Sequence, residues 1–201
     1  MKRLLLATRN VHKAREIQEI LGPEFELRDL TAYPEISGIV ESGKSFEENA
    51  KLKAIAVSIK LPGLVIGDDS GLEAEALGGA PGIYSARYAG KNATDKQNVE
   101  KVLSELPRSG AKTCQRHARF RCVIALAHAG KLLDTFNSAV EGRIVDRARG
   151  SHGFGYDPIF VPNGFEQTFA ELPAEVKNRI SHRAKAIRAL AAKLGALEPS
   201  D

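Results

Sequence analysis

Short apolar runs alternate with amphipathic stretches along the first third of the chain. Residues 4–7 (LLLA) form an apolar run that ends in polar residues, which predicts a buried strand. Apolar side chains then recur at helical spacing over residues 13–21, and a second strand is expected over residues 25–30. A further helix is predicted over residues 46–61, followed by a short strand at residues 64–66. This β-α-β-α-β order is typical of an α/β protein.

The second half of the chain carries two long strand patterns and ends in a helix. Residues 120–127 and 132–145 are predicted to pair as a hairpin that turns at residues 129–130. An apolar stripe over residues 184–194 predicts a C-terminal helix that stops at Gly195. Together with the first half, this pattern predicts an α/β fold with a long mixed central sheet flanked by helices.

Two capping boxes mark the starts of predicted helices. Ser45 is followed three residues later by Glu48, and Thr94 is followed three residues later by Gln97. In such a box the first side chain accepts from a backbone N–H of the helix, and the second reaches back to the N–H of the capping residue. We therefore expect helices to begin directly after Ser45 and Thr94.

The composition is that of an ordinary globular protein. Of the 201 residues, 43% are hydrophobic and 27% are charged, which argues against a disordered or fibrous chain. This length suits one α/β domain or two small lobes that share a core. The 29 basic and 25 acidic residues leave a net charge of +4, which fits a protein that handles anions such as phosphates or nucleic acid.

The cysteines and the N-terminus bear on the cellular compartment. Cys114 and Cys122 form neither a CxxC pair nor a Cys/His cluster with zinc spacing, so we interpret them as free thiols in a reducing compartment. The apolar run at residues 4–7 is too short for a signal peptide, and no stretch is long enough to cross a bilayer. We expect a cytoplasmic protein with no membrane partner.

Asp68 and Asp69 are adjacent carboxylates directly after the apolar run at residues 64–66. Their charges repel each other and are partly desolvated there, which is costly without a compensating partner. Mg²⁺ takes oxygen ligands and is usually held by one or two carboxylates together with substrate phosphates. We interpret the end of this strand as a magnesium site, with Glu41 as a candidate further ligand. The alternative is a turn in which the aspartates cap a helix or bond the local backbone.

The segment Thr8–Lys13 leaves the first predicted strand and enters the first predicted helix. Free backbone N–H groups and the helix dipole at such a point favour phosphate. Thr8 and Asn10 add side-chain donors, and Lys13 adds a positive charge. The segment lacks the glycines and the Gly-Lys-Ser/Thr ending of a Walker A loop. Helix capping with a solvated lysine is the alternative interpretation.

Glycines, aromatic rings and an acid follow one another over residues 151–158 (SHGFGYDP). Glycine lets the backbone approach a flat ligand closely, and Phe154 and Tyr156 are candidates for stacking on a base. Asp157 is a candidate acceptor for a base or a sugar. The alternative is a turn that contains a core aromatic residue.

Cationic side chains gather near the start of the last predicted helix. Lys177 precedes it, and His182 and Arg183 follow Ser181, a candidate N-cap. Positive charge in a first turn opposes the helix dipole, so this placement indicates an anionic or polar ligand. A solvated basic face is the alternative.

Taken together, these segments resemble the inosine/xanthosine triphosphate pyrophosphatases, the HAM1-like family. The resemblance covers nearly the whole chain, and it rests on residues 6–13 (LATRNVHK), 41–50 (ESGKSFEENA), 68–72 (DDSGL), 77–88 (LGGAPGIYSARY), 153–158 (GFGYDP) and 180–183 (ISHR). It implies that residues 1–201 form a single two-lobed α/β domain with a cleft between the lobes, and that the protein is a homodimer. It also implies Mg²⁺-dependent hydrolysis of ITP, dITP and XTP to the monophosphate and pyrophosphate, which clears deaminated purines from the nucleotide pool.

The resemblance further implies roles for individual residues. Asp69 is implied to be the catalytic acid/base and a magnesium ligand, with Glu41 as a second ligand and Asp68 as a supporting one. The residues implied to hold the triphosphate are Thr8, Asn10, Lys13, Lys53 and Ser70. The residues implied to line the nucleoside pocket are Phe154, Gly155, Tyr156, Asp157, Lys177, His182 and Arg183.

Base choice then follows from hydrogen-bond chemistry. Hypoxanthine and xanthine carry a keto acceptor at C6, whereas adenine carries an amino donor. Buried donors such as those of His182 and Arg183 would be left unpaired by adenine, at a cost of about 1–3 kcal/mol. We therefore expect Arg183 to favour ITP over ATP.

Position 9 departs from the family pattern, which commonly has a small residue there, often glycine. Arg9 places a long cationic side chain beside the predicted phosphate segment. It either changes the affinity for the substrate or points to solvent.

Two other functions remain open. A basic nucleic-acid-binding module fits the isoelectric point near 9.1, and it predicts steeply salt-dependent binding, but paired acids in a glycine-rich segment argue against it. We expect no stable binding of nucleic acid. A phosphatase that releases orthophosphate is the other alternative, although the aspartate pair lacks the surroundings of a phosphoaspartate nucleophile.

Overall fold

The computed structural model describes residues 1–110, 112 and 115–196, so Cys114 lies outside the described residues. The strands are β1 (Lys2–Leu6), β2 (Phe25–Asp29), β3 (Leu64–Ala74), β4 (His117–His128), β5 (Lys131–Ile144) and β6 (Phe160–Pro162). The α-helices are α1 (Val11–Leu21), α2 (Phe46–Lys60), α3 (Asp95–Arg108), α4 (Ala174–Ile180) and α5 (His182–Ala196). Short 3-10 helices cover Leu30–Ala32, Glu75–Leu77, Gly82–Arg87 and Asp157–Ile159.

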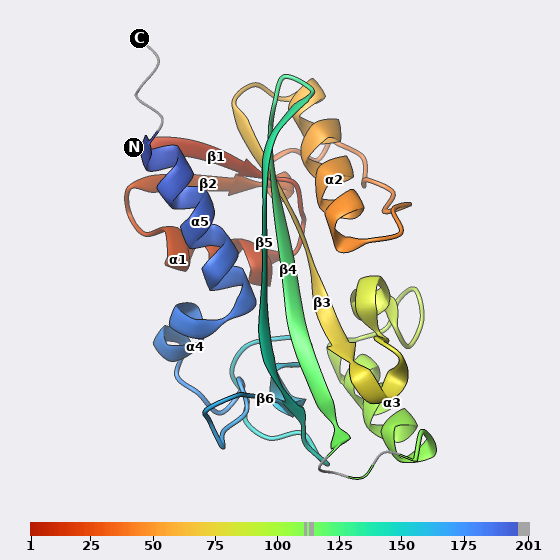
Figure 1. The fold of residues 1–201 in the computed structure, drawn as a ribbon. Coiled ribbons are helices and arrows are strands. Elements are labelled where there is room, and N and C mark those ends of the chain that lie inside the picture. Colours follow the sequence, from red (N-terminus) through yellow and green to blue (C-terminus); the bar gives the residue numbers. More distant parts are fainter. Residues whose placement is uncertain (111, 113–114, 197–201) are drawn as a thin grey trace. The chain divides into compact units, whose positions relative to one another are not determined.

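The strands form one mixed sheet in the order β2-β1-β3-β4-β5-β6 (Figure 1). Strand β1 is parallel to both β2 and β3, whereas β5 and β6 are antiparallel. The predicted α/β class with a long mixed sheet flanked by helices is confirmed. None of the helices in the described ranges is long and apolar enough to span a membrane.

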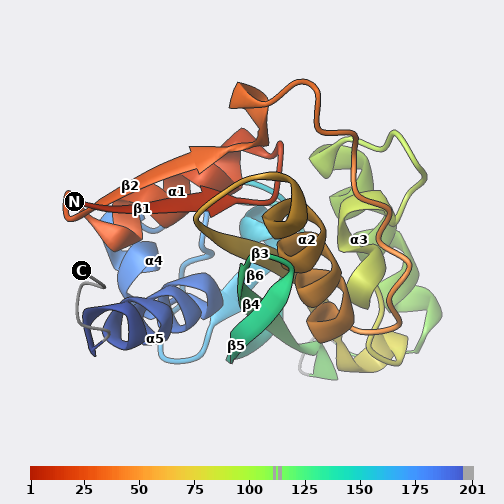
Figure 2. The ribbon, with the colours of Figure 1, turned by 90° about the horizontal axis from the view of Figure 1, so that it is seen from above.

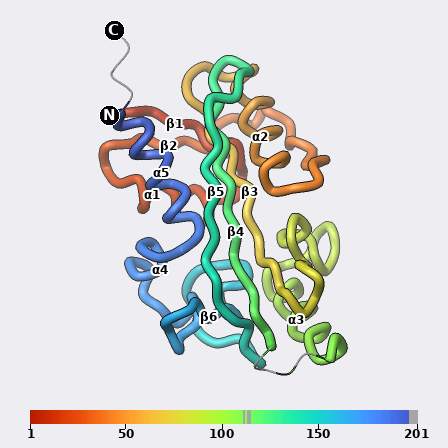
Figure 3. Tube along the Cα trace, in the orientation of Figure 1, coloured from red at the N-terminus to blue at the C-terminus, as the bar shows by residue number. Residues whose placement is uncertain are grey.

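The chain divides into two compact units. Unit 1 contains Met1–Asp69, Cys122–Ser138 and the C-terminal stretch from Arg183, and unit 2 contains Ser70–Arg121 and Ala139–His182. The chain passes from one unit to the other within β3, β4 and β5, which Figure 3 traces as continuous strands, and again at the start of α5.

Unit 1 has helices on both faces of its part of the sheet. Along β1, Leu4 and Leu6 pack with residues of α1 and α5, while Leu5 and Ala7 pack with Val57 of α2. This alternation follows from the two-residue period of a strand. In Figures 1 and 2, α1 and α5 lie on one side of β3 and α2 lies on the other. The apolar end of β1 is therefore buried on both faces, as its continuous apolar run predicts.

Unit 2 has a core built largely from aromatic and aliphatic side chains. Val102 and Leu106 of α3 belong to the same buried cluster as Leu72 of β3 and Phe120 of β4. The Phe120 and Phe160 rings meet edge to face with centroids 4.7 Å apart. This cluster holds the end of β3 and the segment around Phe160 as one packed body.

The main correction concerns β3, which is longer than predicted. The apolar run at residues 64–66 was expected to end the strand, but β3 continues to Ala74, so Asp68 and Asp69 lie inside it. Pairing with β1 stops at Ile66, opposite Leu6, whereas β4 is hydrogen-bonded to β3 on its other side. The aspartates thus lie beyond the end of β1, on a strand that β4 continues to support.

Helix starts agree with the sequence in most respects. The Thr94 box is complete, with both reciprocal hydrogen bonds present at the start of α3. Ser45 caps α2 by accepting from the Glu48 N–H, but the Glu48 carboxylate accepts from the Lys44 N–H rather than from that of Ser45. The β4–β5 hairpin turns at residues 129–130 as predicted.

Two elements were not predicted. Strand β6 has only three residues, and α4 has only seven, so neither offers enough sequence for a clear period. The predicted stop at Gly195 is one residue short, because α5 runs to Ala196. Lys177 consequently lies in the last turn of α4, where a cation suits the helix dipole, and not before the final helix as an isolated residue.

Candidate active site

The segment after β1 forms a capped entry into α1 in unit 1. The Asn10 Oδ1 accepts from the N–H groups of His12 and Lys13 at 3.0 and 3.2 Å. The Thr8 Oγ1 accepts from the Asn10 N–H at 3.2 Å. Helix capping, one of the two interpretations of this segment, is therefore present. It also holds the first turn of α1 directly at the end of β1, where a helix N-terminus favours an anion.

Arg9 binds backbone carbonyls of unit 1. Its guanidinium donates to the carbonyl oxygens of Leu30, Tyr33 and Ile36 at 2.7, 3.2 and 2.6 Å. These carbonyls belong to the segment that follows β2 and precedes Glu41 in the chain. Arg9 therefore ties the segment after β1 to the segment after β2, a role that neither sequence interpretation included.

Asp69 is held by side chains of α2. Its Oδ1 lies 2.8 Å from the Lys53 Nζ, which also lies 2.9 Å from the Glu41 Oε1. Its Oδ2 accepts from the Asn49 Nδ2 at 3.2 Å. Asn49 and Lys53 are four residues apart on α2, so both face the same side of the helix. The structure thus brings together Asp69, Glu41 and Lys53, three residues that the sequence singled out.

Burial sets the protonation behaviour of this group. Burial raises the pKa of Asp69 above its ordinary value, although Lys53 and Lys13 act in the opposite direction. Burial alone would lower the pKa of Lys53, but Asp69 and Glu41 outweigh it and the pKa is raised. An acid with a raised pKa beside a fixed cation is the combination expected of a group that handles protons.

Asp68 faces the opposite side of β3 and meets a different set of partners. Its Oδ1 is paired with the Lys13 Nζ, and its Oδ2 accepts from the Arg183 Nε at 2.9 Å and from the Cys122 Sγ at 3.5 Å. Burial alone would raise the pKa of Asp68, but Arg183 and Lys13 hold it well below its ordinary range. Asp68 is therefore a fully buried, ionised carboxylate with donors on both oxygens.

Arg183 completes a second buried ion pair in unit 1. Its Nη1 lies 2.6 Å from the Glu16 Oε2, and only 2% of its side chain is exposed. Glu16 was missed by the sequence reasoning, although an acid next to Ile17 on the buried side of α1 is an available signal. Cys122 and Asn49 were missed as well, because a buried thiol or amide gives no periodic signal of its own.

The carboxylates available to a metal ion are few. Within residues 1–110, 112 and 115–196, no group of three or more His, Cys, Asp or Glu side chains has an arrangement suited to a metal. Glu41 and Asp69 share one cation, the Lys53 ammonium, through one oxygen each. A pair of carboxylates that already converges on a cation fits the limited protein ligation that Mg²⁺ takes when phosphates supply other oxygens.

In unit 2, the GFGYD segment is organised around Asp157. Its Oδ2 accepts from the Phe154 N–H at 2.9 Å and from the Lys177 Nζ at 2.5 Å. The Lys177 ammonium also lies 4.9 Å from the centre of the Phe154 ring. The Gly155 N–H donates to the Asp95 carboxylate at 2.7 Å. The structure therefore brings together Phe154, Asp157 and Lys177, three residues that the resemblance implied to line the nucleoside pocket.

Two predicted residues of unit 2 are core residues. Tyr156 is buried and donates from its hydroxyl to the Ser85 carbonyl at 2.8 Å. The His182 ring stacks on Phe120, with centroids 4.7 Å apart and 5° between the planes. Phe154 is only partly buried, so of these three rings it is the one with the most exposed surface for a base. Ser70 is partly buried and follows Asp69 within β3.

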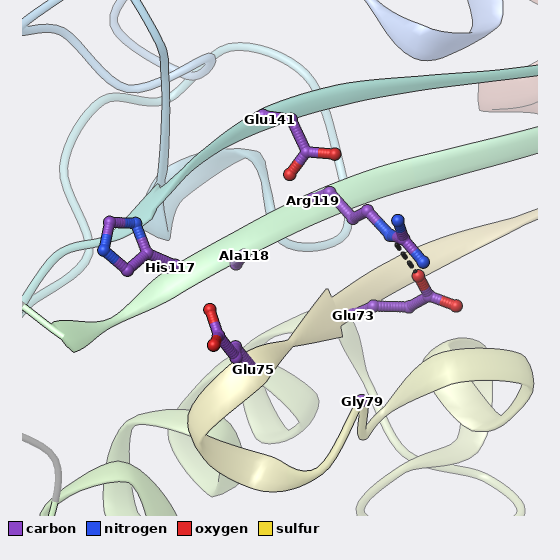
Figure 4. A pocket seen from close by; sticks show the side chains of 7 residues that line it. All are labelled: Glu73, Glu75, Gly79, His117, Ala118, Arg119 and Glu141. Carbon is purple, nitrogen blue, oxygen red and sulfur yellow. Dashed lines mark hydrogen bonds and ion pairs between the residues drawn. The ribbon is translucent and has the colours of Figure 1, made fainter.

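A recess of about 350 Å³ lies elsewhere on unit 2, and Figure 4 shows it from close by. It is lined by Glu73, Glu75, Gly79, His117, Ala118, Arg119 and Glu141. The Arg119 Nε donates to Glu73 at 2.6 Å. None of the predicted site residues lines this recess, so we do not assign it to the candidate site.

Comparison with known proteins places these groups in context. A model of the Ham1 family matches residues 4–193. The chain is 50% identical over 190 residues to a dITP/XTP pyrophosphatase of Shouchella clausii, covering 94% of this chain and 95% of the relative. It is 47% identical over 197 residues to a dITP/XTP pyrophosphatase of Bacillus subtilis, covering 98% of each chain.

Solved structures agree with this match. The structure of a HAM1 protein from Coxiella burnetii superposes with a TM-score of 0.87 at 39% identity, covering 98% of this chain and 100% of that chain. The Ham1 protein of Staphylococcus aureus gives a TM-score of 0.83 at 41% identity, covering 96% of this chain and 98% of that chain.

Proposed function

The chain belongs to the Ham1 family, and from this premise we propose that it hydrolyses dITP, ITP and XTP to the nucleoside monophosphate and pyrophosphate. Relatives about half identical to it over nearly their whole length are named dITP/XTP pyrophosphatases. Within the structure, one observation carries the proposal. The buried carboxylate of Asp69 is joined through Lys53 to Glu41. An acid, a cation and a second carboxylate therefore meet at one place, as the hydrolysis of a triphosphate requires.

Asp69 is the proposed catalytic residue. Cleavage between the α- and β-phosphates needs a water in line with the leaving pyrophosphate and neutralisation of the charge that develops. A carboxylate with a raised pKa is suited to orient that water and to accept its proton. Lys53 and Lys13 are the proposed counter-charges for the phosphates, and no covalent intermediate is required.

Mg²⁺ is the proposed cofactor, with Glu41 and Asp69 as its ligands. When bound, it would neutralise phosphate charge and stabilise the pyrophosphate leaving group. Asp68 was included as a supporting ligand, but donors already occupy both of its oxygens. We therefore propose that Asp68 acts by holding Lys13 and Arg183 in place.

The residues proposed for the triphosphate in unit 1 are Thr8, Asn10, Lys13 and Lys53, with Ser70 next in the chain after Asp69. Thr8 and Asn10 are supported by their position at the start of α1. Lys13 is supported by its side chain, which is partly exposed and pairs with the buried Asp68.

The residues proposed for the nucleoside in unit 2 are Phe154, Gly155, Tyr156, Asp157, Lys177 and His182. Phe154 is the proposed stacking ring, worth about 1–3 kcal/mol per base in comparable sites. Asp157 and Lys177 hold the segment around that ring. Because Tyr156 and His182 are buried, we propose that they support this segment through its backbone and through Phe120.

Arg183 remains the proposed reader of the C6 keto group. Its pairing with Asp68 and Glu16 supports an additional role, because it also fixes the carboxylate that pairs with Lys13. A homodimer and a cytoplasmic location are proposed as well. The resemblance supports the first, and Cys122, a free buried thiol, supports a reducing compartment for the second.

A nucleotide panel tests the proposed function. ITP, dITP, XTP, GTP and ATP are each incubated with the protein and Mg²⁺, and pyrophosphate and orthophosphate are measured separately. We expect pyrophosphate from ITP, dITP and XTP at rates well above those for ATP. Orthophosphate as the only product, or ATP as the best substrate, would overturn the proposal.

A further inference from the structure

Asn49 is a fully buried amide in the first turn of α2, and no sequence argument assigned it a role. Its Oδ1 accepts from the Gly43 N–H at 2.9 Å, and its Nδ2 donates to the Asp69 Oδ2 at 3.2 Å. Its side chain thus bridges the segment that carries Glu41 and the proposed catalytic carboxylate. Both of its partners belong to unit 1.

The chemistry of these partners fixes which end of the amide faces Asp69. A backbone N–H is able only to donate, so the oxygen of the amide must face Gly43. The NH₂ group must then face Asp69. Position 43 also requires glycine for this contact, since a Cβ there would lie 2.6 Å from the Asn49 Oδ1.

Asn49 and Lys53 divide the two oxygens of Asp69 between them. Lys53 is bonded to Oδ1 and Asn49 to Oδ2, so the rotation of the carboxylate is fixed from both sides. The same two side chains reach the segment around Glu41, through the Glu41 Oε1 and the Gly43 N–H. One face of α2 therefore sets the position of Glu41 relative to Asp69.

We propose that Asn49 is a positioning residue for the hydrolysis. Its NH₂ group sets the rotation of the Asp69 carboxylate, and its oxygen holds the segment that carries Glu41. This inference rests on the proposed function of Asp69. Without Asn49, the carboxylate loses one of two fixed donors, and Lys53 alone connects the two proposed metal ligands. Small displacements of reacting groups reduce rates steeply, by about 100-fold per ångström in other enzymes.

Three variants separate positioning from a contribution to folding. Asn49→Ala removes both hydrogen bonds, whereas Asn49→Asp keeps an acceptor for Gly43 and replaces the donor to Asp69 by a second carboxylate. Ser58→Ala is the matched control, because Ser58 lies on the same helix, is buried, and also accepts from a backbone N–H, that of Gly130, at 3.0 Å. Thermal unfolding of each variant reports how much of it is folded.

Turnover of ITP is measured as kcat and KM for each folded variant. We expect kcat to fall about 10- to 100-fold in Asn49→Ala, with KM within about 2-fold of the original, because orientation and not binding is lost. The kcat of Asn49→Asp should fall at least as far, because its added carboxylate repels that of Asp69. Ser58→Ala should keep its kcat. As a second readout, Mn²⁺ binding followed by electron paramagnetic resonance should weaken in Asn49→Ala by about 5-fold and stay unchanged in Ser58→Ala.

Wild-type kcat in folded Asn49→Ala would overturn the proposal, since neither hydrogen bond of Asn49 would then matter. A loss of activity in Asn49→Ala that follows its folded fraction, with a similar loss in Ser58→Ala, would overturn it too. Asp69→Asn distinguishes a failure of the proposed function of Asp69 from a failure of the positioning role of Asn49. If that variant keeps full turnover, the proposed role of Asp69 fails, whereas an inactive Asp69→Asn beside a fully active Asn49→Ala refutes the role of Asn49 alone.

Discussion

Asp68 and Asp69 are adjacent in β3, yet their carboxylates point to opposite faces of the strand and are bonded to different side chains. Asp68 is bonded to Lys13, Arg183 and Cys122, and its pKa is held well below the ordinary range. Asp69 is bonded to Asn49 and Lys53 of α2, and burial raises its pKa. Because successive side chains of a strand face opposite sides, two identical side chains have pKa shifts in opposite directions.

Asp69→Asn should nearly abolish hydrolysis. Asparagine has almost the same shape but is not able to accept a proton, and loss of a general base costs about 100- to 10,000-fold. The measurement is the rate of pyrophosphate release from ITP, with circular dichroism to show that the fold is retained. Rates equal to those of the original protein would remove Asp69 from the mechanism.

Asp68→Asn should lower the free energy of unfolding at neutral pH by about 3 kcal/mol, because it leaves buried cations with one partner fewer. The pH dependence has a definite sign. The folded-state pKa of Asp68 lies below its unfolded value near 3.8, so its stabilisation is complete above the unfolded value, begins to decline there, and is lost as the pH falls through the folded-state pKa.

Urea unfolding of both proteins from pH 7 to pH 3, with a chelator present, checks this prediction. The difference between Asp68→Asn and the original protein should be constant above about pH 5 and shrink toward pH 3. A difference that grows as the pH falls would contradict the depressed pKa.

Arg9→Ala should reduce stability and leave substrate affinity nearly unchanged. The guanidinium donates to three carbonyls and its removal should cost about 2 kcal/mol in the free energy of unfolding. The KM for ITP should stay within about 2-fold, because the proposed phosphate donors are other groups. A KM raised tenfold with unchanged stability would instead support direct contact between Arg9 and the phosphates.

Gly67→Ala should be strongly destabilising. A Cβ at position 67 would lie 2.2 Å from the Ala50 carbonyl oxygen, where β3 and the backbone of α2 approach each other. We expect a loss of about 3 kcal/mol or more in the free energy of unfolding, or failure to fold. Gly38→Ala is the matched control, since a Cβ there meets no atom within 4 Å, and its stability should change little. Equal stability of both variants would contradict this close approach.

Arg183→Ala should reduce the preference for ITP over ATP about tenfold if its guanidinium reads the C6 keto group. Its bond to Asp68 predicts a drop in kcat for both nucleotides as well. The ratio of kcat/KM for ITP and ATP separates the two effects, since only base reading alters the ratio. An unchanged ratio with lower kcat would leave Arg183 as a positioning residue alone.

The local elements of this protein were largely readable from its sequence. Apolar runs and helical spacing predicted β1, α1, α2 and α5, because a strand or a helix that buries one face must repeat its apolar side chains with a fixed period. The Thr94 box predicted the start of α3 because its hydrogen bonds are made within four residues. The motifs around Asp69 also identified the family, since they recur in one order along the chain.

Only the tertiary structure decided which side chains meet. Asp68 and Arg183 are 115 positions apart, and the sequence around neither one indicates the other. The length of β3 depended on β4, because hydrogen bonds from a neighbouring strand extend a strand beyond its own apolar run. Asn49 and Cys122 became visible only as partners of Asp69 and Asp68. Such pairs depend on how layers pack, and packing joins residues regardless of their separation along the chain.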